Sequence, residues 1–234
     1  MKIATILIKA IGVITELVFP KLCLSCEFIE PLKDEELCLL CITTLPKIDK
    51  KNDVMASLIG ASLFPREIEH VYALYYFTKP GKVQDLIHRI KYDSRIDLAH
   101  YFGRELGKQI RRFSALRPFL VPVPLHPKRY KARGYNQAFC IAEGISQELG
   151  CTIDTSIIKR VKYRESQASL DFMGRESGLE NSFEAIPIST GDVARFVMLI
   201  DDVITTGATI KACYEELVSV GYSRIAVASL AISV

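Results

Sequence analysis

Apolar residues along the chain form short unbroken runs separated by longer stretches with helical spacing. Residues 196–200, FVMLI, include no polar side chain, which is typical of a strand buried on both faces of a parallel sheet. Residues 70–77, 119–125 and 225–234 are also apolar and rich in β-branched or aromatic residues. We expect all four segments to be strands. The segment 119–125 should lie at an edge or end irregularly, because its two prolines cannot donate ladder hydrogen bonds.

The stretches between these runs show the spacing of amphipathic helices. Residues 83–90 and 98–110 each carry one apolar face, and residues 138–149 follow Asn136, a suitable N-cap. Apolar residues at positions 213, 217 and 218 predict a further helix after the run 196–200. Strands that alternate with helices in this way predict an α/β fold with an open, mainly parallel sheet flanked by helices.

The N-terminal residues 1–20 are rich in Ile, Leu and Val at helical spacing, but Lys9 and Glu16 interrupt the run. No small-residue cleavage site follows, so the segment matches neither a signal peptide nor a membrane span. We expect an amphipathic helix that packs on the protein; the alternative is a helix that lies on a membrane surface. The sequence thus predicts a cytoplasmic protein without integral membrane association.

The composition limits the size and the kind of fold. A chain of 234 residues with 49% hydrophobic and 24% charged residues can bury one core and a small accessory module. The net charge of +3 is too small to indicate nucleic-acid binding by itself, so such binding could be inferred only from local clusters of basic residues. We expect the N-terminal helix at 1–20, a cysteine module at 21–46, a linker or variable region at 47–69 and the α/β domain at 70–234.

Four of the seven cysteines form two Cys-x2-Cys pairs, Cys23 with Cys26 and Cys38 with Cys41. Two such pairs can supply four thiolates to one tetrahedral zinc ion, which leaves no open coordination position and makes the metal structural. The alternative is a pair of disulfides, which a cytosolic compartment disfavours. The sequence therefore predicts a small structural zinc module of the ribbon type.

Two adjacent carboxylates, Asp201 and Asp202, follow the run 196–200 at the place where that strand should end. A short segment rich in hydroxyl groups comes next and precedes a predicted helix. Such a segment forms a phosphate site, because the backbone N–H groups at a helix N-terminus are unpaired and the helix dipole is positive there. The acids would repel a bare phosphate, so we expect them to bind sugar hydroxyl groups or a metal. The candidate phosphate-binding residues are Val203, Thr205, Thr206, Gly207, Ala208 and Thr209.

A basic segment lies between the strand 119–125 and the helix 138–149. We expect a loop there, with Gly134 at a positive φ or at a close backbone approach. Clustered cations beside a helix N-terminus are what a pyrophosphate group needs, since it requires both donors and countercharge. The alternative is a solvated basic loop without a ligand. The candidate pyrophosphate-binding residues are Lys128, Arg129, Lys131 and Arg133.

Residues 159–183 are polar and only weakly periodic over an unusual length. Loops of this length inside a compact domain are commonly functional, so we expect a lid that closes over a polyanion and excludes water. A surface hairpin without function is the alternative. Residues 88–92 add cations that either reach a phosphate or remain on the surface. The candidate lid residues are Arg160, Arg164, Gln167, Arg175 and Asn181.

The order apolar run, Asp-Asp, Thr-Thr-Gly-Ala-Thr at 196–209 resembles the phosphoribosyl pyrophosphate motif of type I phosphoribosyltransferases. Nearly the whole chain resembles the ComF family of competence proteins, whose members resemble such transferases with a zinc ribbon in front. Tyr135 departs from the family pattern, where a phenylalanine is expected. The resemblance rests on the Phe-Pro and cysteine pairs near the N-terminus, Leu86-Ile87 with Lys91-Tyr92, residues 121–126 (VPVPLH), residues 133–137 (RGYNQ), Ser166-Gln167 and the motif itself.

The resemblance implies a protein that binds phosphoribosyl pyrophosphate as its magnesium complex and takes part in DNA uptake. Asp201 and Asp202 would be the catalytic acids that hold the ribose hydroxyl groups. The segment 205–209 would hold the 5′-phosphate, and the four cations would stabilise the leaving pyrophosphate. No motif indicates the acceptor or the oligomeric state. The alternative is a non-catalytic scaffold that binds single-stranded DNA or competence-machinery proteins, with Tyr130 or Tyr135 stacking on bases.

Overall fold

The structure, a computed structural model, describes residues 20–31, 35–48, 68–113, 117–161, 182–188 and 195–233. The chain divides into two compact units, Met1–Leu45 and Pro46–Val234. The helix predicted at 1–20 and most of the linker predicted at 47–69 lie outside the described residues, so both remain predictions.

The first unit is built around the two cysteine pairs. Its described helix, α2 (Leu39–Thr44), begins directly after Cys38. Cys23 lies at a tight turn, because its carbonyl accepts the N–H of Glu27 and its own N–H donates to the Ile29 carbonyl, both at 2.9 Å. Local backbone structure therefore holds one pair at a turn and places the other at the start of a helix.

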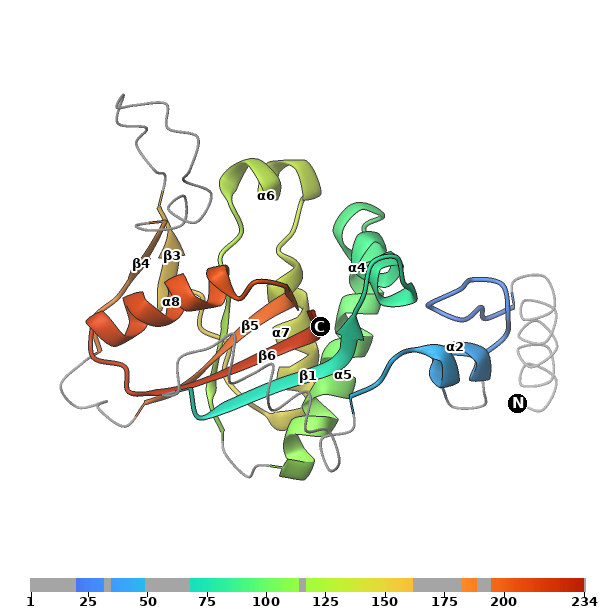
Figure 1. Cartoon of the computed structure of the whole chain (residues 1–234), viewed down its shortest axis with the longest axis horizontal. Coiled ribbons are helices and arrows are strands. Elements are labelled where there is room, and N and C mark those ends of the chain that lie inside the picture. The colour runs from blue at the N-terminus through green and yellow to red at the C-terminus, as the bar shows by residue number, and fades with distance from the viewer. Residues whose placement is uncertain are drawn as a thin grey trace, which may run out of the picture. The chain divides into compact units, whose positions relative to one another are not determined.

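The second unit is organised around a four-stranded sheet formed by β1 (His70–Phe77), β2 (Phe119–Pro122), β5 (Phe196–Ile204) and β6 (Arg224–Ser233). The spatial order is β1-β6-β5-β2, and every adjacent pair is parallel. Figure 1 shows β1, β6 and β5 side by side. Because β5 and β6 lie in the middle, they are buried on both faces, as the apolar runs predicted. The α/β class with a mainly parallel sheet is confirmed.

Helices cover both faces of this sheet. The described helices of this unit are α4 (Lys82–Tyr92), α5 (Ile96–Phe113), α6 (Pro127–Arg133), α7 (Gln137–Leu149) and α8 (Ala208–Ser219), and α6 buries none of its residues. α5 and α7 pack on one face, and α8 lies across the other (Figure 1). In the core on the α8 side, Cys213 and Leu217 join Val197 and Leu199 of β5. No helix in the described part of the chain combines the length and apolar character that crossing a bilayer requires.

α5 and α7 cross at unusually short range because both carry glycine at the crossing. A Cβ atom added to Gly103 would lie 2.4 Å from the Ile141 carbonyl oxygen, and one added to Gly144 would lie 2.4 Å from the His100 carbonyl oxygen. Neither position has room for a methyl group, so the two backbones are in direct contact. This crossing fixes how the residues of the two helices face one another.

β5 is longer than the apolar run that predicted it. Asp201 and Asp202 belong to the strand, since the ladder to β6 continues through Asp201 opposite Ser229 and Val203 opposite Ala231. The prediction that the strand ends before the two acids was wrong. Hydrogen bonds to a long neighbouring strand outweigh the low strand preference of aspartate, which is a weak and context-dependent effect.

The basic segment after β2 is a helix, α6, rather than the predicted loop. Pro127 is at the first helical position, His126 Nδ1 accepts the N–H of Lys128 at 3.1 Å, and Gly134 ends the helix with a φ of 81°. Proline and glycine are well suited to these two ends, and the capped ends outweigh the repulsion among the cations. The positive φ predicted for Gly134 is confirmed. So is the edge position of β2, which ends at Pro122 and pairs only with β5 among the described strands.

A separate antiparallel pair consists of β3 (Ile158–Arg160) and β4 (Phe183–Ala185). These strands form the two ends of the polar segment predicted as a lid at 159–183. Arg160, at the end of β3, is described. The other candidate lid residues lie outside the described residues: Arg164, Gln167, Arg175 and Asn181.

Candidate ligand-binding site

A cavity of about 430 Å³ lies at the carboxyl ends of β2 and β5. The chain leaves β2 toward α7 and leaves β5 toward α8, so the connections turn to opposite faces of the sheet at this point. Ligands of open parallel sheets bind in the crevice at such a switch. The remaining walls come from the end of β1 and from α4, α6 and β3. The fold therefore places a ligand-sized space where the sequence predicted the acid pair.

Asp201 and Asp202 both line this cavity. Because neighbouring residues of a strand point to opposite faces, their carboxylates diverge. Asp202 is 6% exposed and Asp201 is half-buried, and Asp201 Oδ1 accepts the backbone N–H of Asp202 at 2.8 Å. Burial, and then the charge of Asp202, raise the pKa of Asp201 above its usual range, although the Asp202 N–H, Lys91 and Arg160 oppose that change.

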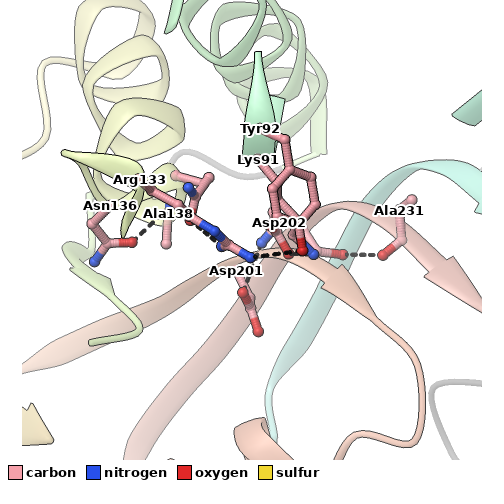
Figure 2. A network of polar contacts seen from close by, with 10 residues as sticks. Lys91, Tyr92, Arg133, Asn136, Ala138, Asp201, Asp202 and Ala231 are labelled. Carbon is pink, nitrogen blue, oxygen red and sulfur yellow. Dashed lines mark hydrogen bonds and ion pairs between the residues drawn. The ribbon is translucent and has the colours of Figure 1, made fainter. Parts of the chain in front are cut away.

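Lys91, in the last turn of α4, supplies a cation to the acid pair. Its Nζ lies 3.1 Å from Asp202 Oδ1. Figure 2 shows Lys91 and Tyr92 gathered with Arg133 around the two acids of β5. The sequence left open whether the cations at 88–92 reach a site or remain on the surface, and the structure places Lys91 in the cavity wall.

The four basic residues predicted to bind pyrophosphate separate into two groups. Arg129 and Arg133 line the cavity, whereas Lys128 and Lys131 are not among its described walls. Residues four apart share a helix face, so α6 presents its two arginines to the cavity together. The sequence did not predict this division, because it depends on the segment being a helix.

Arg133 is positioned by contacts with two cavity residues. Its Nη1 donates to Gln137 Oε1 at 2.9 Å, its Nη2 donates to the Tyr92 hydroxyl at 3.4 Å, and its guanidinium lies 5.1 Å from the centroid of the Tyr92 ring. Gln137 is 2% exposed, and its Nε2 has no hydrogen-bond partner in the described part of the chain. A buried donor without a partner is costly, so it favours a ligand acceptor at this wall.

Two further polar residues that line the cavity, Gln84 and Lys79, were not predicted from the sequence. Gln84, His88 and Lys91 stand at i, i+4 and i+7 of α4, so they form one polar stripe beside the buried apolar face. This polar stripe was the feature of the sequence from which a contribution of α4 to the site could have been predicted. Its three residues line the cavity together with Ile87.

The segment after the acids passes from β5 into α8, as predicted. Gly207 has a φ of 73° and is the N-cap residue of α8. The Ala208 N–H donates to Thr206 Oγ1 at 3.4 Å, so the N–H groups of Thr209 and Ile210 are the first-turn donors that an anionic ligand would meet. Of the candidate residues in this segment, the cavity is lined by Val203, Thr205 and Thr209.

The four cysteines of the first unit form a compact cluster. The ligand atoms of Cys23, Cys26, Cys38 and Cys41 all lie within 4.8 Å of one another. Cys26 Sγ and Cys38 Sγ are 3.8 Å apart. A tetrahedral zinc ion with bonds of about 2.3 Å separates its sulfur ligands by about 3.8 Å, so the cluster is consistent with a structural zinc site. Each of the four is a free cysteine in the described residues, which disfavours the disulfide alternative.

Comparison with known proteins gives no matching family model, but it gives several relatives. Competence protein F of Haemophilus influenzae is 32% identical over 151 residues, which are 62% of this chain and 66% of that protein. DNA utilization protein YhgH of Escherichia coli K12 is 29% identical over 148 residues, 61% of this chain and 63% of that protein. Competence protein ComFC of Streptococcus pneumoniae is 26% identical over 204 residues, 84% of this chain and 88% of that protein.

The matched region thus spans slightly less than two thirds of the first two relatives and most of the third. All three are named as competence or DNA utilization proteins. On these similarities, the chain is a homologue of the ComF/ComFC-family competence proteins.

Proposed function

We propose that this protein is phosphoribosyltransferase-like and binds phosphoribosyl pyrophosphate with magnesium in the cavity at the ends of β2 and β5. The observation that supports this most directly is the meeting of three kinds of group in one cavity. The two acids of β5, the N-terminal segment of α8 and arginines from α6 and β3 all contribute to its walls. A ribose that carries a phosphate at one end and a pyrophosphate at the other needs all three.

Each part of this ligand is assigned to one wall. The first-turn amide groups of α8, with Thr205 and Thr209, bind the 5′-phosphate. Asp201 and Asp202 accept hydrogen bonds from the ribose hydroxyl groups, since ionised carboxylates are strong acceptors. The pyrophosphate is neutralised by the cavity arginines, Arg129, Arg133 and Arg160. Lys128 and Lys131 have no part in this assignment.

Transfer requires the bond between ribose C1′ and a pyrophosphate oxygen to break while a nucleophile bonds to C1′. The pyrophosphate leaves with the electron pair, and the arginines stabilise the charge that it gains. The acids hold the ribose so that C1′ stays oriented toward the nucleophile. Magnesium would add positive charge at the pyrophosphate, and Asp201 is the carboxylate that it would contact, because Asp202 already pairs with Lys91.

The names of the relatives suggest a role for this protein in DNA uptake or DNA use. A second candidate function is therefore single-stranded DNA binding by a scaffold of this fold. The observation that favours it is a basic surface of α6 outside the cavity, where Lys128 and Lys131 flank Tyr130, which is 53% exposed. Tyr135 is less suited to stacking, because it is half-buried and its hydroxyl donates to the Ile90 carbonyl.

The main proposal is tested by calorimetry with phosphoribosyl pyrophosphate, with and without magnesium. We expect magnesium-dependent binding by the wild type and binding weaker by about 100-fold or more in a double variant, Asp201→Asn with Asp202→Asn, because each of the two lost charged hydrogen bonds is worth about 1.5–3 kcal/mol. Asp97→Asn is the matched control, since Asp97, in the first turn of α5, pairs with Arg95 and is not among the described cavity walls. If the wild type releases or absorbs no heat of binding at millimolar phosphoribosyl pyrophosphate, the proposal is refuted.

The second function is tested by the affinity for single-stranded DNA as a function of salt. Affinity for DNA falls as salt rises, and replacing Lys128 and Lys131 with glutamine should make the slope of log affinity against log salt less negative by about 0.7 for each DNA phosphate that is no longer neutralised. Arg224→Gln, a change at an exposed ion pair with Glu69, serves as the control for a general reduction of positive charge. An unchanged slope in the double lysine variant would exclude this surface from DNA binding.

A further inference from the structure

A second cluster of metal-ligating side chains lies outside the sites described above. His100 of α5 and Cys140 and Glu143 of α7 each offer a ligand atom, and these atoms all lie within 4.8 Å of one another. His100 Nε2 and Glu143 Oε2 are 2.9 Å apart. Imidazole, thiolate and carboxylate are the ligand types that zinc takes in proteins. None of the three residues is used by the proposed function.

The close crossing of α5 and α7 holds these three residues in place. Gly144, next to Glu143, has its α-carbon so near the His100 carbonyl oxygen that an added Cβ would lie 2.4 Å from it. Cys140 and Glu143 are three residues apart and share a face of α7. A metal site needs its ligands on rigid elements that cannot move apart, and a crossing with backbones in contact provides that.

The burial of the cluster suits an ion that enters from solvent. Cys140 is 5% exposed, while the side chains of His100 and Glu143 are 30% and 39% exposed. The thiol therefore forms the inner wall, and the other two ligands form the entrance. A thiolate and a carboxylate together carry two negative charges, which balance a divalent cation in a partly buried place.

One side of the cluster opens to a cavity. Cys140 and Glu143 line a second space of about 740 Å³, whose walls include Phe139 and Tyr135. An ion held by three protein ligands has a fourth tetrahedral position, and two of the three ligand residues, Cys140 and Glu143, border this cavity. Zinc sites with three protein ligands and one open position bind an exchangeable water or ligand atom there.

We propose that His100, Cys140 and Glu143 bind a zinc ion whose fourth position faces this cavity and holds water or a small donor ligand. Binding requires the Cys140 thiol to release its proton to solvent and the ion to replace the hydrogen bond between His100 and Glu143. Zinc bonds of about 2.0–2.3 Å separate ligand atoms by about 3.3–3.8 Å, so side-chain adjustments of about 1 Å complete the site.

The test is the zinc content of the full-length protein after equilibration with micromolar zinc and removal of the excess. We expect His100→Gln and Cys140→Ser each to bind one zinc ion fewer per chain than the wild type. Cys151→Ser is the matched control, because Cys151 is also 5% exposed but lies outside the cluster; it should keep the wild-type content. His100→Gln changes a partly exposed side chain, so it keeps the test valid if Cys140→Ser fails to fold.

Cobalt provides a second readout that a purely structural role would not change. Thiolate-to-cobalt charge-transfer absorption should decrease by one sulfur ligand in Cys140→Ser and stay unchanged in Cys151→Ser. Equal zinc content in wild type, His100→Gln and Cys140→Ser would overturn the proposal. So would a cobalt spectrum that Cys140→Ser leaves unaltered.

Discussion

The Lys91 ammonium nitrogen lies 3.1 Å from Asp202 Oδ1 and joins the last turn of α4 to the strand that carries both acids. The Asp202 side chain is 9% exposed, so its charge is largely removed from water. The cation offsets part of that cost and part of the repulsion between Asp201 and Asp202. A ligand that binds the two acids therefore enters a site whose charges are already partly balanced.

We first predict that Lys91→Met destabilises the protein at pH 8 by about 1–3 kcal/mol, because it leaves a buried carboxylate without this cation. Urea unfolding of the two proteins measures the loss. Lys211→Met is the control, since Lys211 and Glu215 form an exposed pair 4.0 Å apart that is worth about 0.3–0.5 kcal/mol. Equal losses in the two variants would contradict the prediction.

The second prediction concerns Asp201, whose pKa is raised above its usual range first by burial and then by Asp202. A folded state that holds a proton more tightly than the unfolded state loses stability as the pH rises from the unfolded pKa, about 3.9, through the folded pKa. Asp201→Asn has no such loss. Its Tm should exceed that of the wild type by about 2–4 °C at pH 8, equivalent to about 1 kcal/mol, and match it near pH 4.

Thermal unfolding of both proteins across that pH range is the measurement for Asp201→Asn. Asp97→Asn is the opposite case, because a hydrogen bond from Arg95 lowers the pKa of Asp97. That group gives stability above its unfolded pKa and loses it as the pH falls, so the variant should be less stable at pH 8. A gain for Asp201→Asn that does not change with pH would show that proton binding is not its cause.

The sequence correctly predicted those features of the structure that depend only on residues close together along the chain. The apolar run at 196–200, the N-cap Asn136 and the positive φ of Gly134 are all properties of a few neighbouring residues, and each is confirmed. The four-cysteine cluster follows equally directly from two short pairs. These features required no knowledge of distant contacts.

The features that were missed depend on contacts between distant segments. Asp201 and Asp202 stay in β5 because β6 extends alongside them, and Lys91 reaches the site only because α4 packs near the end of β5. The separate placement of Arg129 and Lys128 follows from a helix whose ends are capped. Charge counts along the sequence could not separate cations that face a cavity from cations that face elsewhere.

The third prediction uses this separation of the α6 cations. Arg129→Gln and Arg133→Gln should each weaken binding of phosphoribosyl pyrophosphate about 10-fold or more, because a charged hydrogen bond is worth about 1.5–3 kcal/mol. Lys128→Gln and Lys131→Gln should change the affinity by less than about 3-fold, since they remove only a screened long-range charge. Calorimetry at fixed ionic strength compares the four. Equal losses from lysines and arginines would mean that net charge alone determines binding.

The fourth prediction concerns the cysteine module. Removing its metal with a chelator, or replacing Cys41 with serine, should unfold the described part of Met1–Leu45, because small zinc modules take most of their stability from the metal. Since Pro46–Val234 is a separate compact unit, the amide protection of β5 and β6 should change little. Hydrogen exchange with mass spectrometry measures both. Unchanged exchange around Cys23 and Cys38 would show that the module does not depend on a metal.

The last prediction tests the close crossing of α5 and α7 by whether Gly144→Ala raises or lowers the stability of the protein. In an ordinary helix, Gly→Ala stabilises by about 1 kcal/mol, so propensity alone predicts that Gly144→Ala is stabilising. At this position the new Cβ would lie 2.4 Å from the His100 carbonyl oxygen, and overpacking of this kind costs about 1–3 kcal/mol. We therefore expect net destabilisation in urea unfolding, and Gln147→Ala on the exposed face of α7 should stay within about 0.5 kcal/mol. A Gly144→Ala variant that is more stable than the wild type would refute the close crossing. Because His100 must move to admit the methyl group, Gly144→Ala should also weaken binding of the zinc ion proposed at His100.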